Sequence, residues 1–291
     1  MKRYLIAAAL FAATASPAAA YTGFLLPQDF WPSGTTGNVQ ASYAQQFFTP
    51  SVALGGDFQV VDPNGQAGVL SGVEVGSNTT SLAVETPEAG TYLLTTGEQL
   101  GRVTTLVATP DGQWRPLGQG ETAPAGAQTN TLQTVTVSSV YLTRGSPNRT
   151  AVDHPVGRLA IHPITDPNQI VQASGFQVEL LFDGQPFPNM PIVVYSANDP
   201  DTKLDRFVVT GTDGRANLTF AQPGQYVLAV RHRANAPAGS AANVQSYTTT
   251  LTIDVMAAQH ALSRVEPPAR QETTQRRRPQ PQPHRAGRWD R

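Results

Sequence analysis

Gly90-Thr91-Tyr92-Leu93-Leu94 recurs in the second half of the chain as Gly224-Gln225-Tyr226-Val227-Leu228. Each copy follows an alternating apolar run, at 82–84 and at 218–220. In antiparallel sandwiches, a Gly-x-Tyr segment is typical of a late strand whose tyrosine ring packs inward while its hydroxyl anchors a corner. A glycine before the strand provides backbone conformations that other residues resist. The repeat therefore predicts two similar β-units; it concerns architecture rather than chemistry.

Strand-like segments follow one another along most of the chain. They are rich in Val, Thr, Leu, Tyr and Phe, mostly alternate apolar with polar residues, and are bounded by Gly, Pro, Asp and Asn. No segment shows a helical period. We therefore predict an all-β fold of two tandem antiparallel sandwiches. The expected strands are 38–43, 57–61, 91–96, 102–108, 132–142, 176–182, 191–195, 206–210, 226–231 and 247–255.

The first 20 residues have the form of a cleaved secretory signal. Lys2 and Arg3 precede an apolar run at 5–13, and small residues at 16–20 precede Tyr21, the expected mature N-terminus. The apolar run is too short to span a membrane, and no later stretch approaches the required length of about 20 residues. The chain has no cysteine, so it lacks the lipoprotein thiol and any disulfide. We expect a periplasmic protein of a Gram-negative envelope that is not a lipoprotein and has no membrane span.

Charge is distributed unevenly along the chain. Residues 21–256 carry ten basic and eighteen acidic side chains, whereas residues 257–291 carry eight arginines and three acids. An acidic body argues against general nucleic-acid binding. The segment 257–291 is rich in Arg, Gln and Pro and has too few apolar residues to offset the entropy of ordering, which predicts a disordered tail.

Composition also predicts where the domains meet. The interval 144–155 contains Gly145, Pro147, Asn148 and Pro155, as linkers do. We predict a signal peptide at 1–20, an N-terminal sandwich at 21–150, a C-terminal sandwich at 151–256 and the tail at 257–291. The tail is either a solvated extension or an electrostatic tether to anionic envelope polymers.

Several segments resemble the DUF4198 family, exported bacterial proteins sometimes labelled nickel-uptake or NikM-like. In the first half these are Tyr21-Thr-Gly-Phe-Leu-Leu-Pro27, Gln45-Gln-Phe47-Phe48-Thr-Pro50 and Asp57-Phe58-Gln-Val-Val61. In the second half they are Leu181-Phe182-Asp183-Gly184, Thr212-Asp213-Gly214-Arg215 and Pro223-Gly224-Gln-Tyr226. The second half also resembles carboxypeptidase-regulatory-like and other transthyretin-like sandwiches. The resemblance implies immunoglobulin-like or transthyretin-like domains and an accessory role in uptake of a divalent transition metal, nickel or cobalt, beside a TonB-dependent system.

One position departs from that family. Many members begin after cleavage with histidine, whose amino group and imidazole together could chelate a divalent metal, whereas this chain has Tyr21 there. Without thiolates, a transition-metal site would need imidazole and carboxylate ligands. The candidate ligands are His232, which follows a strand at a position where the resembling proteins often carry histidine, and His162, in Leu159-Ala-Ile-His162-Pro163. Each has a plain alternative, as a strand-end residue between two arginines and as a solvent-facing residue, respectively.

Other polar or aromatic segments also have two interpretations. The loop 198–205 brings three aspartates together, which suits a hard cation or an ordinary solvated turn. Asp183-Gly184 and Asp213-Gly214 are typical of hairpin turns. Phe47 and Phe48 could line a ligand platform or fill a core, and in a regular strand they would point to opposite faces.

The chain lacks the linear motifs of common enzymes, such as His-Glu-x-x-His, Gly-x-Ser-x-Gly or a phosphate-binding glycine loop. We therefore predict no enzyme. Two hypotheses remain: a periplasmic, non-catalytic accessory protein in nickel or cobalt uptake, and a structural envelope module that binds a protein or polysaccharide partner without metal.

Overall fold

The computed structural model describes residues 21–199 and 206–258, and within them every regular element is a β-strand. This confirms the all-β prediction. The signal at 1–20, most of the acidic loop and nearly all of the tail lie outside the described residues. The described part contains no helix, and so none with the length and apolar character needed to cross a membrane.

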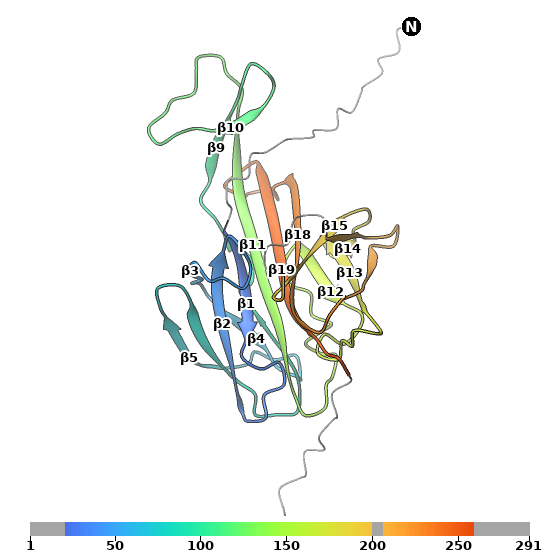
Figure 1. The fold of residues 1–291 in the computed structure, drawn as a ribbon. Helices are drawn as coiled ribbons and strands as arrows, with labels where there is room; N and C mark the ends of the chain where they lie inside the picture. Colours follow the sequence, from blue (N-terminus) through green and yellow to red (C-terminus); the bar gives the residue numbers. More distant parts are fainter. Residues whose placement is uncertain (1–20, 200–205, 259–291) are drawn as a thin grey trace, which may run out of the picture.

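Three sheets make up the described part of the chain (Figure 1). The first, sheet A, has the order β1-β2-β6-β5, with β3 also paired to β2. Its pairs are all antiparallel. Its strands are β1 (Thr22–Pro27), β2 (Thr36–Ala44), β3 (Val52–Ala53), β5 (Leu70–Val75) and β6 (Thr80–Glu85).

Sheet B is much larger and has the order β10-β9-β11-β19-β18-β15-β16, with β7 and β8 also paired to β11, and β4 paired to β7. Its strands from the first half of the chain are β4 (Gln59–Val61), β7 (Gly90–Thr95), β8 (Gln99–Leu100), β9 (Thr104–Ala108), β10 (Trp114–Pro116) and β11 (Thr129–Arg144). Those from the second half are β15 (Pro191–Ser196), β16 (Phe207–Val209), β18 (Gly224–Asn235) and β19 (Val244–Val255).

Sheet C belongs to the second half and has β13 at its centre, paired with β12, β14 and β17. Its strands are β12 (Leu159–Pro163), β13 (Phe176–Phe182), β14 (Gln185–Pro186) and β17 (Arg215–Leu218). The turn between β13 and β14 has positive φ at both Asp183 (53°) and Gly184 (71°). Positive φ at both central residues is the signature of a type I′ hairpin, which confirms the turn predicted from Asp-Gly.

The repeated Gly-x-Tyr segment has the same structure in both halves. The hydroxyl of Tyr92 donates to the carbonyl of Glu88 at 3.0 Å, and that of Tyr226 donates to the carbonyl of Gln222 at 2.7 Å. Both rings are buried. The predicted tyrosine corner therefore forms twice, once in β7 and once in β18.

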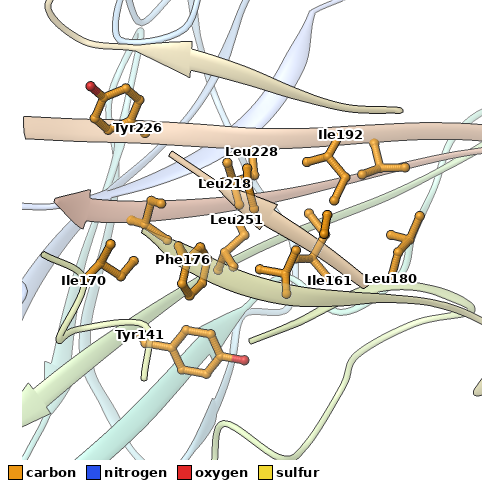
Figure 2. Close-up of a cluster of buried hydrophobic side chains, with 14 of the residues drawn as sticks. Tyr141, Ile161, Ile170, Phe176, Leu180, Ile192, Leu218, Tyr226, Leu228 and Leu251 are labelled. Atoms are coloured by element: carbon orange, nitrogen blue, oxygen red, sulfur yellow. The ribbon is translucent and has the colours of Figure 1, made fainter. Parts of the chain in front are cut away.

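Sheet B is a middle layer with sheet A against one face and sheet C against the other. Alternate residues of β11 enter different cores: Val140 and Leu142 pack with sheet A, and Tyr141 packs with sheet C. Figure 2 shows the second of these cores, in which Leu228 and Leu251 of sheet B lie among residues that include Ile161 and Leu180 of sheet C. The two predicted sandwiches therefore share a sheet.

The shared sheet depends on one parallel pair. Residues Leu132 to Val140 of β11 pair in parallel with Val244 to Thr252 of β19. Figure 1 shows these two long strands side by side through the middle of the molecule. Since β11 also pairs with β7, β8 and β9, and β19 with β18, neither strand has a free edge along this stretch. The two halves are thus joined by a hydrogen-bonded ladder as well as by the connecting chain.

Strand β1 of sheet A also packs against β18, a strand from the second half of the chain. Phe24 packs with Val227 and Ala229 of β18, and Phe47 joins them. Phe47 and Phe48 lie in a turn rather than a strand, with positive φ (66°) at Phe48, and both rings contact Phe24 edge-on. The expectation of opposite faces in a regular strand does not apply to this turn. Phe47 and Phe48 instead pack into the contact between β1 and β18.

Candidate functional site

A cleft opens where β1 begins. Its walls come from the start of β1, from β2 and from residues 99–101, and its floor comes from β11, β18 and β19 of sheet B. It has a volume of about 310 Å³, near the lower end of the range for small-ligand sites. We call it the threonine cleft. It is lined by Tyr21, Thr22, Tyr43, Gln99, Leu100, Gly101, Thr134, Thr136, Arg231, Ser246 and Thr248.

The floor of the threonine cleft follows from strand register. Thr136 of β11 pairs with Thr248 of β19, which pairs with Arg231 of β18. Two residues earlier in each of these two strands, Thr134 of β11 pairs with Ser246 of β19. Because residues two apart in a strand share a face, these hydroxyls form two parallel rows on the side of sheet B that carries β1.

The hydroxyls of the cleft floor differ in their hydrogen bonding from the hydroxyls that β1 covers. Further along the same strands, Thr250 donates to the carbonyl of Gly23 at 2.8 Å and lies 3.0 Å from the hydroxyl of Ser138. Beyond the start of β1, the hydroxyls of Thr134, Thr136, Ser246 and Thr248 have no hydrogen-bond partner among the described residues. The cleft therefore exposes two rows of hydroxyls, whereas equivalent hydroxyls further along the same strands form hydrogen bonds within the protein.

Arg231 supplies the charge of the cleft. Its guanidinium donates to the hydroxyl of Thr22 at 2.7 Å, and it forms no ion pair with any carboxylate in the described ranges. A guanidinium carries five N–H donors in a planar fork. Most of its donor capacity is therefore open toward the cleft.

A second hollow lies on the outer face of sheet A and has a volume of about 560 Å³. Small residues such as Gly72, Ser81 and Ala83 leave the space, and Gln40 and Glu74 stand beside it. Its lining comes from sheet A and the residue that follows β1, and its charged group is a carboxylate. Because it is hollow but lacks a cation in its lining, it offers a control position for substitutions in the threonine cleft.

His232, a predicted metal ligand, lies on the opposite face of β18 from Arg231. Its ring is 4.9 Å from the centroid of Phe182 and 4.7 Å from that of Phe187, edge-on to both. Burial, together with the nearby positive charge of Arg158, lowers the pKa of the His232 imidazole below 6.5. These neighbours offer packing rather than further ligands.

Arg158 organises the surroundings of His232. Its guanidinium donates to both carboxylate oxygens of Asp183, at 2.5 and 2.7 Å, and to the hydroxyl of Tyr247. It also lies 4.8 Å from the ring centroid of Phe182. The hydrogen bonds with Asp183 raise the pKa of Arg158 and lower that of Asp183. This group satisfies its own charges and connects β12, the β13–β14 turn and β19.

His162, the other predicted ligand, lies between two carboxylates. Its Nε2 is 3.0 Å from Asp153 Oδ1, and its Nδ1 is 3.6 Å from Glu179 Oε2. Because the carboxylates flank different ring nitrogens, the three groups do not converge on one point. Arg149 binds Asp153 with two hydrogen bonds and lowers its pKa, and Arg215 lies 3.4 Å from Glu179.

The structure does not bring His162 and His232 into one site. Within residues 21–199 and 206–258, no group of three or more His, Cys, Asp or Glu side chains is arranged to hold a metal ion. The sequence did not point to the threonine cleft, whose residues come from six separate segments. The available sequence signal was the hydroxyl-rich run 246–250; only strand pairing places Arg231 beside it.

Comparison with known proteins gives one family and several remote structural likenesses. A search of curated proteins found no match. The D0-D1 domain of Intimin has a TM-score of 0.20 and 12% identity, over 79% of this chain and 96% of that one. The D00-D0 domain of Intimin has a TM-score of 0.17 and 14% identity, over 80% and 99%.

The BSP domain of a biofilm associated protein has a TM-score of 0.18 and 12% identity, over 80% of this chain but 30% of that one. A family model described as "Domain of unknown function (DUF4198)" matches residues 18–234. Since this match covers more than half of the chain, the protein belongs to the DUF4198 family.

Proposed function

We propose that this chain is an exported, non-catalytic binding module that holds an envelope partner, a polysaccharide or a protein, at the threonine cleft. The observation that carries the proposal is the set of four unpartnered hydroxyls beside Arg231. Groups that could hydrogen-bond within the protein, as Thr250 does a few residues away, are here directed at an open cleft. Such groups fix the orientation of a ligand.

The chemistry of the lining supports binding rather than catalysis. Its ionisable side chains are Tyr21, Tyr43 and Arg231. General acid–base catalysis near neutral pH uses groups such as imidazole or a perturbed carboxylate, and the described lining contains neither. The envelope location depends on the signal-like segment 1–20; N-terminal sequencing of protein secreted to the periplasm should begin at Tyr21.

A bulky substitution in the cleft tests the proposal. Ser246→Tyr fills the floor of the threonine cleft, whereas Ser81→Tyr fills the hollow on sheet A by the same change of side chain. We expect immobilised parent and Ser81→Tyr protein to retain the same components of a solubilised envelope fraction, and Ser246→Tyr to lose them. Equal retention by all three proteins, or loss in Ser81→Tyr alone, would contradict the proposal.

The nickel or cobalt role implied by the family resemblance is tested by the same material. Capture that is equal with and without a chelator supports a partner bound without metal. Calorimetry of dialysed protein with Ni²⁺ or Co²⁺ provides the direct measurement, with His232→Ala and His162→Ala as variants. Binding near neutral pH that either variant abolishes would favour the metal-uptake role over ours.

A further inference from the structure

We infer that the threonine cleft recognises an acidic saccharide, such as a uronate-containing chain, with Arg231 binding the carboxylate and the threonine rows binding sugar hydroxyls. The inference rests on the proposed function, because it names the class of ligand for the same site. Four features of the cleft support it: the chemistry of its floor, its aromatic wall, its charge and the pairing of its strands.

The floor suits a ligand that both donates and accepts hydrogen bonds. Each of the side chains Thr134, Thr136, Ser246 and Thr248 has a hydroxyl with one donor and two acceptor sites, and none has a partner in the described ranges. Neighbouring strands lie about 4.8 Å apart, so paired hydroxyls such as Thr136 and Thr248 can contact different hydroxyls of one sugar ring.

The wall of the cleft adds flat apolar surface. Tyr21 is 48% exposed, and Tyr43 on β2 stands beside it. Tyrosine has an apolar body and a polar tip, which suits a partner that is partly apolar and partly wet. A sugar ring has this character, because its faces carry C–H groups and its edges carry hydroxyls.

The charge of the cleft is opposite to that of the body. Residues 21–256 carry more acidic than basic side chains, yet Arg231 faces the cleft without a described ion pair. Arg233 lies on the same face of β18, paired with Ser246. A guanidinium binds a carboxylate through two parallel hydrogen bonds. Two arginines on one face of an otherwise acidic body favour a ligand that places its acid there, because the acidic surface elsewhere repels anions.

The pairing of the floor strands argues against an extended peptide. A peptide that joins a sheet needs a strand edge with free backbone groups. At the cleft, β11 is paired on both sides, with β8 and β19, and β19 is paired with β11 and β18. The floor therefore offers side-chain groups, not a backbone ladder, to its ligand.

Calorimetry with defined probes tests this assignment. The exported chain is titrated with a short oligogalacturonate, with the same oligomer after reduction of its carboxyls to alcohols, and with oligoglutamate. We expect the oligogalacturonate to bind most tightly. Arg231→Gln should weaken its binding about tenfold or more, since a hydrogen-bonded charge pair is lost.

Arg215→Gln is the matched control, because it removes the same charge from sheet C, on the other side of sheet B. It should change the affinity for oligogalacturonate by less than twofold. A heat of unfolding in each variant equal to that of the parent excludes a folding defect. Equal binding of the acidic and reduced oligomers, or no effect of Arg231→Gln, would overturn recognition of the acid.

Three further outcomes are also decisive. Oligoglutamate binding as tightly as oligogalacturonate would overturn the saccharide and leave a general anion site. If no saccharide probe binds while Ser246→Tyr still abolishes envelope capture, the acidic saccharide is excluded and the proposed function stands. If capture too is insensitive to Ser246→Tyr, both fail.

Discussion

Tyr92 and Tyr226 hold equivalent corners through single hydroxyls. Tyr92 donates to the carbonyl of Glu88 and also accepts from its amide at 3.0 Å, whereas Tyr226 donates to Gln222. Burial raises the pKa of Tyr92 above 10.0, as expected for a hydroxyl that stays protonated within its corner. The glycines before the tyrosines have φ of 144° at Gly90 and 136° at Gly224, a region that favours glycine.

We predict that Tyr92→Phe and Tyr226→Phe each lower the free energy of unfolding by about 1–2 kcal/mol, because a hydrogen bond is lost and its acceptor is left behind. Urea denaturation measures the change. Tyr21→Phe, at an exposed position, should change the free energy of unfolding by less than about 0.5 kcal/mol. Corner variants as stable as Tyr21→Phe would show that the hydroxyls do not stabilise the fold.

The two corner glycines should differ in their tolerance of a methyl group. A Cβ on Gly90 would lie 2.4 Å from Cβ of Pro63, whereas one on Gly224 would meet the side-chain amide of Asn198 at 2.9 Å. An amide at the end of a side chain can move, but a proline ring cannot move far. Gly90→Ala should therefore lower the melting temperature more than Gly224→Ala; the opposite order would contradict this reading of the two turns.

His232 makes stability depend on pH. Burial favours its neutral form and lowers its pKa in the folded state, so the unfolded chain takes up a proton at higher pH than the folded chain. Its contribution to stability is complete above about pH 6.5 and is lost as pH falls through the lower folded pKa. His232→Phe keeps an aromatic ring between Phe182 and Phe187.

We therefore expect the parent to lose more stability than His232→Phe between about pH 7.5 and pH 5.5. Chemical denaturation at both pH values gives the difference, and other titrating groups cancel in the comparison. Identical pH dependence of the two proteins would mean that the imidazole titrates alike in the folded and unfolded chain.

At the scale of elements, β11 has the central role. It pairs with β7, β8 and β9 along one edge and with β19 along the other, and its residues enter the cores on both faces of sheet B. The strand β10, by contrast, pairs with β9 and with no other described strand, and its side chains are exposed. A defect in β11 should spread to both halves, and one in β10 should stay local.

We predict that Val137→Pro in β11 abolishes folding of both halves, since proline removes a ladder donor and is excluded from central strands. Arg115→Pro in β10 should leave both cores protected. Hydrogen exchange read by mass spectrometry distinguishes the cases, with peptides from β7 and β13 as reporters. Protection of β13 in Val137→Pro would show that the second half folds without β11.

At the scale of the whole molecule, the shared sheet predicts cooperative unfolding. Separating the halves would expose an edge of β11 and an edge of β19, and would also open the core that joins Leu93 and Tyr141 to sheet C. Two-state behaviour requires such mutual dependence. Parallel strands, moreover, rarely face solvent.

Calorimetry of the full chain should therefore show one transition, with equal calorimetric and van't Hoff enthalpies. The fragment 21–150 made alone should aggregate or remain unfolded, because β11 would present a long unpaired edge. Two well-separated transitions, or a monomeric fragment with native hydrogen-exchange protection, would contradict this view of the junction.

Much of the architecture was predictable from local patterns. Alternation located ten of the strands, the Gly-x-Tyr repeat located both corners, and Asp183-Gly184 specified its turn, because each depends on residues close together in the chain. A further signal was present but is ambiguous: Tyr226 to Val230 is apolar without interruption, which suits a strand buried on both faces.

Local sequence is enough to specify the strands, the turns and the corners, since backbone sterics and side-chain alternation act within a few residues. Three features follow from tertiary packing instead: β11 and β19 pair in parallel, His232 lies between two phenylalanines, and Thr136 and Thr248 line a cleft beyond the start of β1. Those features depend on how segments that lie from about 45 to more than a hundred residues apart are brought together. Between strands that no short turn connects, the register depends on how whole faces pack, and a local pattern does not name the partner strand.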